Sequence, residues 1–498
     1  MRPFLIDIHV HPGLKPYGKS FSVQRGTNSP DPTKEHSIWR KDHPNDLERL
    51  LERSLGLVKF TQSDFQSLTS GHVHCICASL YSIEQGLVKL KTGSGWLTDT
   101  LTNFISGLGK DRINFLQSNK DYFSDLEGEY RFYNELHHRT VWIKGIARKY
   151  ILLKNFAELE TAIASDRHAD GFHNIFVILT IEGMHNLDSR MDLADGDEDQ
   201  FLANVDKLKS WTYPPFFVTF AHHFYNKLCG HAESLVDMIQ DQLTRQEFQM
   251  NTGFTPLGWK VLEKLLDHTG GRRIHVDIKH MSRLSRKQYF EYLQNSRGQE
   301  LAAGQLPVIV SHGACNGFKS EAEKIYGPGM EDTGRHMYDK DINFYDDEIL
   351  FVARSGGIFG LQLDERRIAS KNYKRGSRLR SLFASKFKRQ LANSRMVWNN
   401  IQHMAILLDQ HELPAWDCIT IGSDYDGLID SVNLFWSAED LPVLAKCLEI
   451  KAEEWLSGGK YDFKNPTNRI TATEIIDKIF YSNAMDFFRK YFNGINEI

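Results

Sequence analysis

Eight short apolar runs, spread from the first residues to the last quarter of the chain, form the main pattern of this sequence. They are rich in Val, Ile and Phe, and polar residues rarely interrupt them. Such runs are typical of strands that are buried on both faces of a parallel sheet. The predicted strands lie at 5–10, 72–81, 176–181, 216–221, 274–279, 308–311, 356–363 and 418–423.

Segments with helical periodicity separate the predicted strands. One of them, 256–267, places five apolar side chains on a single stripe: Leu257, Val261, Leu262, Leu265 and Leu266. Others lie at 45–59, 285–294, 346–353 and 395–411, whereas 12–37 is rich in Gly, Pro and Lys and is predicted to be a long loop. Strand and helix alternating eight times predict a (β/α)8 TIM barrel of the α/β class.

One interval is too long for an ordinary connection. Residues 82–170 lie between the second and third predicted strands, well beyond the usual length of a βα crossover. We predict a large, mostly helical insertion near the barrel mouth, with helices at 96–107 and 122–138 and an extra strand within 141–147. Because no interdomain linker, repeat or low-complexity tract is evident, residues 1–498 are expected to form one elaborated domain.

Histidines and carboxylates close one predicted strand after another. His9 and His11 end the first run, and their i, i+2 spacing puts them on the same face of a strand. Later runs end in Glu182, His222, His280, His312 and Asp424. In a (β/α)8 barrel, sites form at the C-terminal ends of the strands. The sequence therefore predicts that these side chains meet at one end of the barrel.

The residue types favour a pair of divalent ions. Imidazole and carboxylate without thiolate suit Zn²⁺ or a similar first-row ion better than Mg²⁺ or Ca²⁺. We assign His9, His11 and Glu182 to one ion, and Glu182, His280 and His312 to the second, so that Glu182 bridges. A water between two such ions is acidified to near neutrality and becomes a nucleophile.

Two further residues are expected to act on the substrate. Asp424 is predicted to serve as general base and then as general acid toward the leaving amine, and His222 to stabilise the oxyanion. His185 and His231 follow strand ends, and either could contact substrate. Taken singly, a histidine at a strand end is more often structural than a ligand. Five imidazoles and two carboxylates at corresponding strand ends carry the prediction.

Several nearby polar residues are predicted to lie outside the centre. His72 and His74 open their strand instead of closing it, so they are expected at the opposite, stability face of the barrel. His223 is expected to point away from His222, as adjacent residues of an extended chain do. Asp277 is predicted to be structural, and Asp426 either supports the centre or is a polar turn residue.

Composition excludes some partners. The formal net charge of −4 offers no basic field for nucleic acid or an anionic membrane. Six cysteines without CxxC pairing favour a reducing compartment. Neither a membrane-length apolar run nor a signal-peptide pattern is evident. We expect a cytoplasmic protein whose partner is a small-molecule or dipeptide substrate, with a homodimer left open.

With these residues in hand, the chain resembles the membrane (renal) dipeptidase family of zinc metallopeptidases, within the amidohydrolase superfamily. Ile181-Glu182-Gly183-Met184-His185 is similar to the family's Glu-Gly-Gly-His segment with its bridging glutamate. Ile421 to Gly427 resembles Gly-Gly-Asp-Phe-Asp-Gly, whose first Asp is catalytic. Segments 219–223, 276–282, 308–312, 400–404 and 478–483 match as well, whereas 82–170 is largely unmatched.

Two positions depart from the family. Its first motif is His-x-Asp, where this chain has His9-Val10-His11, so a ligand remains but the site charge changes by one unit. Its Arg-Asn pair grips the substrate carboxylate, and here the pair reads Ile342-Asn343. An Ile cannot replace a bidentate guanidinium. Asn343 is still predicted to bind substrate, with cations nearby that could compensate: Arg335, Lys340, Arg366 and Arg367.

Three functions follow from these features. The leading hypothesis is a binuclear metal-dependent hydrolase that cleaves a dipeptide or another small amide. The second keeps this chemistry but acts on a different amide, a lactone or an N-acyl compound. The third is a catalytically idle metal-binding scaffold whose insertion binds a partner.

Overall fold

The computed structural model describes residues 4–42, 60–88, 107–235, 246–374, 384–459 and 461–493. The helix predicted at 45–59, and nearly all of the one predicted at 96–107, lie outside the described residues.

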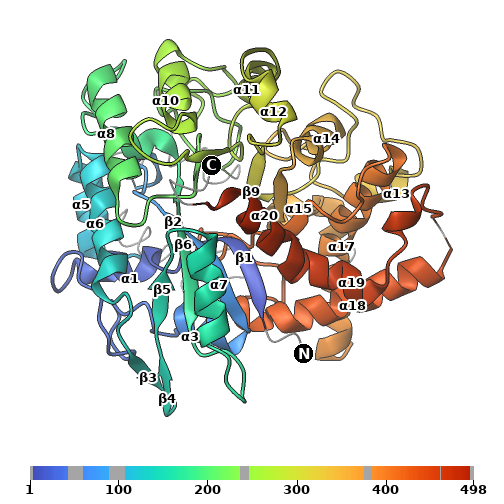
Figure 1. The fold of residues 1–498 in the computed structure, drawn as a ribbon, viewed down its shortest axis with the longest axis horizontal. Coiled ribbons are helices and arrows are strands. Elements are labelled where there is room, and N and C mark those ends of the chain that lie inside the picture. The colour runs from blue at the N-terminus through green and yellow to red at the C-terminus, as the bar shows by residue number, and fades with distance from the viewer. Residues whose placement is uncertain are drawn as a thin grey trace.

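Eight parallel strands form a nearly closed barrel (Figure 1). Their order around the barrel follows the chain: β1 (Leu5–Val10), β2 (Val73–Leu80), β6 (Ile175–Glu182), β7 (Phe217–Thr219), β8 (His275–Asp277), β9 (Ile309–Gly313), β10 (Ile358–Leu361) and β11 (Ile419–Ile421). Beyond the end of β11, Asp424 N donates to His9 O at 3.0 Å and His11 N donates to Tyr425 O at 2.9 Å, which joins the last strand to the first. The predicted TIM barrel is confirmed, as are all eight predicted strands.

The strands are buried along their whole length, as their apolar runs predict. One apolar cluster joins the first halves of β1, β2 and β6 to α7 (Phe156–Ser165) and α20 (Asn483–Tyr491). Ile6, Cys75 and Phe176 belong to it, as do Phe487 and Phe488 of α20. Polar side chains are therefore concentrated toward the opposite ends of the strands, where the predicted centre lies.

The predicted crossover helices that fall within the described residues are present. They are α10 (Pro256–Leu266), α11 (Arg283–Ser296), α14 (Asp346–Arg354) and α17 (Lys386–Gln410), with α3 (Phe65–Ser70), α8 (Glu198–Ser210), α18 (Leu441–Ser457) and α19 (Ala472–Asp477) completing the outer layer. Side-chain caps set several of their starts: Thr255 accepts from Gly258 N before α10, and Ser385 from Lys388 N before α17. α17 begins nine residues before the predicted Arg395.

The loop predicted at 12–37 is partly wrong, because it contains α1 (Leu14–Ser20). Gly and Pro are frequent in loops, so the composition of this stretch predicts a loop instead of a helix. Pro16 lies in the first turn of α1, where its missing N–H costs no intrahelical hydrogen bond.

The insertion mixes helices and strands. It contains α5 (Lys110–Ser118), α6 (Tyr122–Glu135), a hairpin of β3 (Val141–Ile143) and β4 (Ile146–Arg148), β5 (Tyr150–Leu152) and α7. The single strand predicted within 141–147 is wrong: Lys144 and Gly145 both adopt positive φ (50° and 79°), as a tight hairpin turn requires. The unpredicted β5 pairs in parallel with the first residues of β6.

No helix among the described residues is both long and apolar enough to cross a bilayer.

Candidate metal centre

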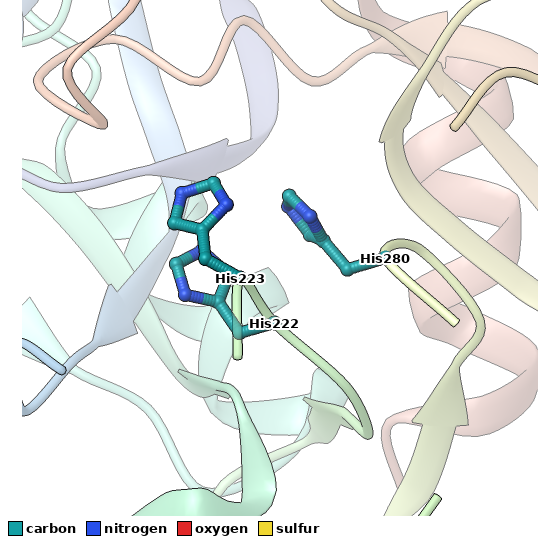
Figure 2. A group of neighbouring side chains, drawn as sticks. All are labelled: His222, His223 and His280. Carbon is teal, nitrogen blue, oxygen red and sulfur yellow. The ribbon is translucent and has the colours of Figure 1, made fainter. Parts of the chain in front are cut away.

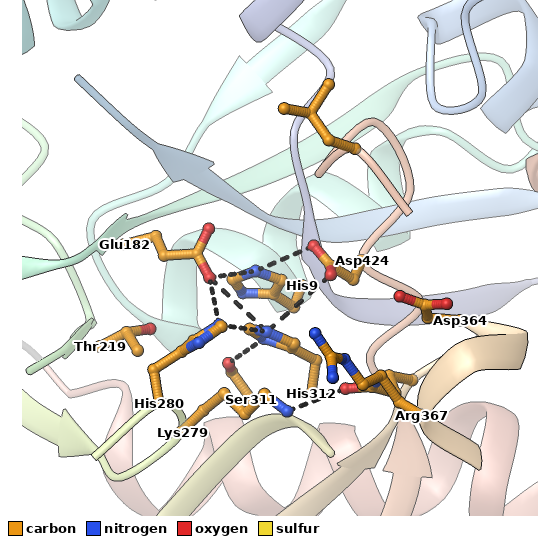
Figure 3. A network of polar contacts seen from close by, with 12 residues as sticks. His9, Glu182, Thr219, Lys279, His280, Ser311, His312, Asp364, Arg367 and Asp424 are labelled. Atoms are coloured by element: carbon orange, nitrogen blue, oxygen red, sulfur yellow. Dashed lines mark hydrogen bonds and ion pairs between the residues drawn. The ribbon is translucent and has the colours of Figure 1, made fainter. Parts of the chain in front are cut away.

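The predicted ligands converge at the C-terminal ends of the strands (Figure 3). Glu182 is the last residue of β6, His312 lies within β9, and His9 within β1. His280 and Asp424 each follow a strand by three residues and adopt left-handed backbone conformations, with φ of 65° and 63°. Non-glycine residues rarely adopt this conformation, and it is found where a site holds a side chain in one direction.

Four of these residues form a first group with the spacing of metal ligands: His9, His11, Glu182 and Asp424. The Nε2 atoms of His9 and His11 are 3.2 Å apart. Glu182 Oε2 lies 3.0 Å from His11 Nε2, and Oε1 lies 3.6 Å from His9 Nε2. Asp424 Oδ1 is 3.7 Å from His9 Nε2 and 3.6 Å from His11 Nε2.

Glu182, His280 and His312 form a second group. The Nε2 atoms of the two histidines are again 3.2 Å apart. Glu182 Oε1 lies 3.5 Å from His280 Nε2 and 3.6 Å from His312 Nε2. Asp424 Oδ2 lies 3.9 Å from His312 Nε2, so its two oxygens face one group each. Glu182 belongs to both groups, which is the bridging position that the sequence predicts.

These distances fit divalent cations. Ligands about 2.0–2.1 Å from a tetrahedral Zn²⁺ are about 3.3 Å from one another, close to the separations of 3.2 Å within each histidine pair. The Nδ1 atoms of His9, His11 and His280 are buried and are bonded by no described residue. Nε2 of each of these rings lies 3.0–3.6 Å from Glu182, and the residues fit an ion in each group.

Charge in the metal-free centre is arranged around Glu182. Burial opposes its ionisation, but His222, His9 and His11 outweigh burial and hold the pKa of Glu182 well below its usual range. Burial and the neighbouring Glu182 raise the pKa of Asp424 well above its usual value. Although burial disfavours a charged His11, Glu182 raises its pKa to about 9. A cation that binds here displaces the proton on His11.

A carboxylate that sequence reasoning missed positions His222. Nδ1 of His222 lies 2.7 Å from Glu84 Oε2, and Nε2 lies 3.5 Å from Glu182 Oε1. Glu84 also accepts hydrogen bonds from Phe224 N at 3.0 Å and Tyr81 Oη at 3.1 Å. Glu84 follows β2 by four residues, so extending the strand-end rule past the apolar run would have found it.

The prediction for His223 is wrong. Its ring centroid lies 3.9 Å from that of His222 instead of on the opposite side of the chain. β7 ends at Thr219, so the alternation of an extended strand no longer applies at these residues.

Three other predicted contacts have backbone partners. Asn343 Nδ2 donates to Arg367 O at 2.7 Å and Tyr338 O at 2.9 Å. His185 Nε2 lies 2.7 Å from Ser82 O, and His231 Nε2 lies 2.9 Å from Gln246 O. These bonds hold loops around the centre, and a role for these side chains in binding substrate stays a prediction.

The two remaining aspartates have structural positions. Asp277 accepts from Thr219 Oγ1 at 2.6 Å and from Ser311 N at 3.0 Å, which ties three strands together. Asp426 accepts from Lys15 Nζ at 2.7 Å and from Ser63 N at 2.7 Å, which fixes the chain segments beside the barrel mouth. At the other end of the barrel, His74 Nδ1 lies 2.9 Å from Asn174 O.

Arg367 is a cation close to the centre. Ile342, at the position where the resemblance leads one to expect an arginine, is buried and apolar. Arg367 is 8% exposed, donates through Nη2 to Ser234 O, and lies near Asp364 and Asp424 (Figure 3). Of the other predicted cations, Arg366 is paired with Asp364 at 2.8 Å, whereas Arg335 and Lys340 are paired with surface carboxylates.

Lys279 is a second buried cation beside the centre. Its Nζ donates to Gln362 Oε1 at 3.0 Å. Burial, followed by the charge of Arg367, lowers the pKa of Lys279 to about 7.

The barrel resembles solved protein structures. The sequence matches no protein-family model and no curated protein sequence. The probable dipeptidase PvdM from Pseudomonas aeruginosa matches in structure with a TM-score of 0.50 and 12% identity, over 98% of this chain and 96% of that one. The dipeptidase AC, described as a metallopeptidase, has a TM-score of 0.49 and 11% identity, over 99% and 100% of the two chains.

The fold and the centre define an α/β barrel with two adjoining groups of candidate metal-ligand residues at the C-terminal ends of its strands. The likeness to PvdM extends over nearly the whole of both chains, and it is a likeness of fold. The resemblance to the dipeptidase family that the motifs predict is thus confirmed at the level of the fold.

Proposed function

We propose that this protein is a binuclear metal-dependent hydrolase, resembling dipeptidases, that cleaves a dipeptide or another small amide. The observation that carries the proposal is the convergence of four imidazole Nε2 atoms on Glu182, with Asp424 facing both groups. His9, His11 and Glu182 would hold one ion, and Glu182, His280 and His312 the other, with Zn²⁺ the ion that the donor set favours. Divalent ions, when bound, supply an acidified water and Lewis acidity.

Asp424 is the proposed acid–base group. Its carboxylate faces both groups, so it can take a proton from a nucleophile between them and return it to the leaving amine. Its two oxygens lie 3.6–3.9 Å from Nε2 atoms of both groups, so a substrate between the groups is within reach.

His222 is the proposed oxyanion-stabilising group. Burial opposes a charged ring, but Glu84 outweighs it and raises the pKa of His222 above its ordinary value. An imidazolium carries a proton on each nitrogen. Nδ1 then donates to Glu84, and Nε2 donates toward a developing negative charge beside Glu182.

Arg367 is the proposed anchor for a substrate carboxylate. It lies near Asp424 in place of the family's arginine at the position of Ile342, and a guanidinium binds a carboxylate with two parallel hydrogen bonds. Nη2 gives one of its two protons to Ser234 O, so the bidentate pair would use its second proton together with a proton of Nη1 or Nε. This assignment favours a substrate with a free carboxylate, such as a dipeptide or an N-acyl amino acid.

The test combines metal analysis with a substrate panel. Purified protein should contain two divalent ions per chain and hydrolyse dipeptides, and Asp424→Asn should keep the ions but lose at least about 100-fold in kcat. Fewer than one bound ion per chain would refute the proposal. N-acyl amino acids, simple amides and lactones belong in the same panel, because activity on these alone would favour the second hypothesis. Two bound ions without any turnover would favour the idle scaffold.

We also propose that the described parts of the insertion and the barrel form one domain. α6 contributes Glu129, which accepts from Tyr81 N at 2.7 Å, directly after β2. Tyr133 of the same helix accepts from Gly13 N at 2.8 Å, three residues after the first strand ends. Helix α6 therefore buttresses the loops that carry His11 and Glu84. Limited proteolysis should release no stable barrel that lacks α6.

A further inference from the structure

Three histidines form another group beside the proposed two-ion centre: His222, His223 and His280 (Figure 2). One ring nitrogen of each lies within 4.8 Å of those of the others. The ring centroids are 3.9 Å apart for His222 and His223, 4.6 Å for His222 and His280, and 5.1 Å for His223 and His280. The hydrolytic mechanism proposed above uses His222 and His280 but gives His223 no role.

The rings of His222 and His223 are held in the manner of metal ligands. Nδ1 of His222 lies 2.7 Å from Glu84 Oε2, and Nδ1 of His223 lies 2.7 Å from Ser234 Oγ. Ser234 Oγ is itself held by Gln246 Nε2 at 2.7 Å. Histidines that bind metals through one nitrogen commonly bond a carboxylate or another polar group through the other. This arrangement leaves Nε2 of both rings as the ligand atom.

The geometry allows an ion after a small adjustment. Nitrogens about 3.3 Å apart surround a tetrahedral zinc, so separations of up to 4.8 Å must shorten by roughly 1.5 Å. His223 is only partly buried, so packing restrains its ring less than it restrains the buried rings of His222 and His280. An all-imidazole set suits Zn²⁺, Cu²⁺ or Ni²⁺ and does not suit Mg²⁺ or Ca²⁺.

We propose that His222, His223 and His280 form an alternative position for the second divalent ion; this inference rests on the two-ion function proposed above. His280 Nε2 also faces Glu182 and His312, so an ion at one position excludes an ion at the other. An ion held by His222 withdraws this ring from the oxyanion. A protein with its second ion at the alternative position is therefore inactive. His223 determines the fraction of the second ion that binds there.

Substitutions that remove one position at a time test the proposal. His312→Ala removes a ligand of the active position alone, and His223→Ala removes a ligand of the alternative position alone. The measurement is the amount of zinc bound per chain in equilibrium dialysis at several free zinc concentrations. His312→Ala should still bind two ions and lack activity, whereas the double variant His223→Ala/His312→Ala should bind one. His223→Ala by itself should stay active and bind its second ion at least about threefold more weakly than the wild type.

His72→Ala is the matched control, since His72 is a partly buried histidine at the other end of the barrel. It should change neither zinc content nor activity. The inference is overturned if His312→Ala already loses the second ion, or if the double variant keeps two, while the two-ion function of the wild type stands. If the wild type holds a single ion and is inactive, the proposed function fails. Loss of that ion in His223→Ala, but not in His72→Ala, then supports the alternative position, and its retention overturns it.

Discussion

Nδ1 of His222 lies 2.7 Å from Oε2 of Glu84, and this contact links the loop after β2 to the loop after β7. The two residues are 138 positions apart in the chain. The Glu84 carboxylate fixes the direction of the imidazole and raises its pKa, while burial opposes the charge. The same carboxylate is kept ionised: burial opposes this as well, but His222 lowers the pKa of Glu84 to about 2.

Replacing Glu84 by Gln should therefore disable His222 without removing it. We expect kcat to fall by about 10- to 100-fold, the usual effect of losing a partner that orients a functional histidine. The substitution lowers the pKa of His222. The loss of activity at high pH should therefore begin at a lower pH than in the wild type. Tyr81→Phe is the matched control, since it removes only the hydroxyl that donates to Glu84 at 3.1 Å. Equal pH profiles for Glu84→Gln and the wild type would contradict this role.

Replacing Glu182 by Gln should separate the two metal groups. Glu182 is the carboxylate shared by both, and an amide offers one neutral oxygen in place of a charged bridge. We expect bound zinc to fall from two ions to at most one, with activity reduced at least about 1,000-fold, since the nucleophile depends on both ions. Metal analysis after dialysis measures the first effect and a turnover assay the second. A variant with two ions and full activity would remove Glu182 from the bridge.

Arg367 is expected to decide the affinity for substrates with a free carboxylate. Arg367→Met should raise KM for such a substrate about 10- to 100-fold, and Arg367→Lys should recover only part of this loss, because an ammonium cannot form the bidentate contact. The same substrate with its carboxylate converted to an amide is the control. Its kcat/KM should change little on substitution. If both substrates lose equally, Arg367 supports the fold of the site and does not bind the carboxylate.

Glu129 should make the metal-free protein less stable as the pH rises. Burial raises its pKa to about 7 from an ordinary 4.5, so the folded chain holds a proton that the unfolded chain releases. The free energy of unfolding should fall between about pH 4.5 and pH 7 for this reason. Glu129→Gln keeps an acceptor for Tyr81 N but carries no charge. At pH 8 we expect it to be more stable than the wild type by about 1–3 kcal/mol, from denaturant unfolding.

The control for this experiment is Glu127→Gln, a less buried glutamate on the same helix. It should leave the dependence of stability on pH unchanged. The free energy of unfolding of the wild type and that of Glu129→Gln could change equally with pH. Such a result would show that ionisation of Glu129 does not destabilise the folded protein.

A buried ion pair should hold the insertion together. Arg112 of α5 donates to Asp125 of α6 through both terminal nitrogens, at 2.5 and 2.7 Å, and both side chains are buried. Arg112→Met leaves the Asp125 charge buried without this partner, which should cost about 3–5 kcal/mol of unfolding free energy. The double variant Arg112→Met/Asp125→Leu should recover most of the loss. Equal stability of Arg112→Met and the wild type in urea would show that the pair contributes nothing.

Local pattern explains why so much of the barrel could be predicted. A strand buried on both faces has to be apolar throughout, so β1, β6 and β9 are visible in the sequence, and the polar residue that ends each run is visible as well. The hairpin of β3 and β4 and the strand β5 are three residues each, too short to produce a period. They depend on the sheet and the helices around them.

The sequence by itself determined the eight strands, their order, and the residue types at their ends, because these are properties of short segments and of connections between neighbours. Only the tertiary structure decided which side chains meet. Glu84 reaches His222, His223 turns toward His280, and Arg367 stands near Asp424. These contacts depend on loop conformations after the strands, where no periodicity restricts the backbone and partners are distant in sequence.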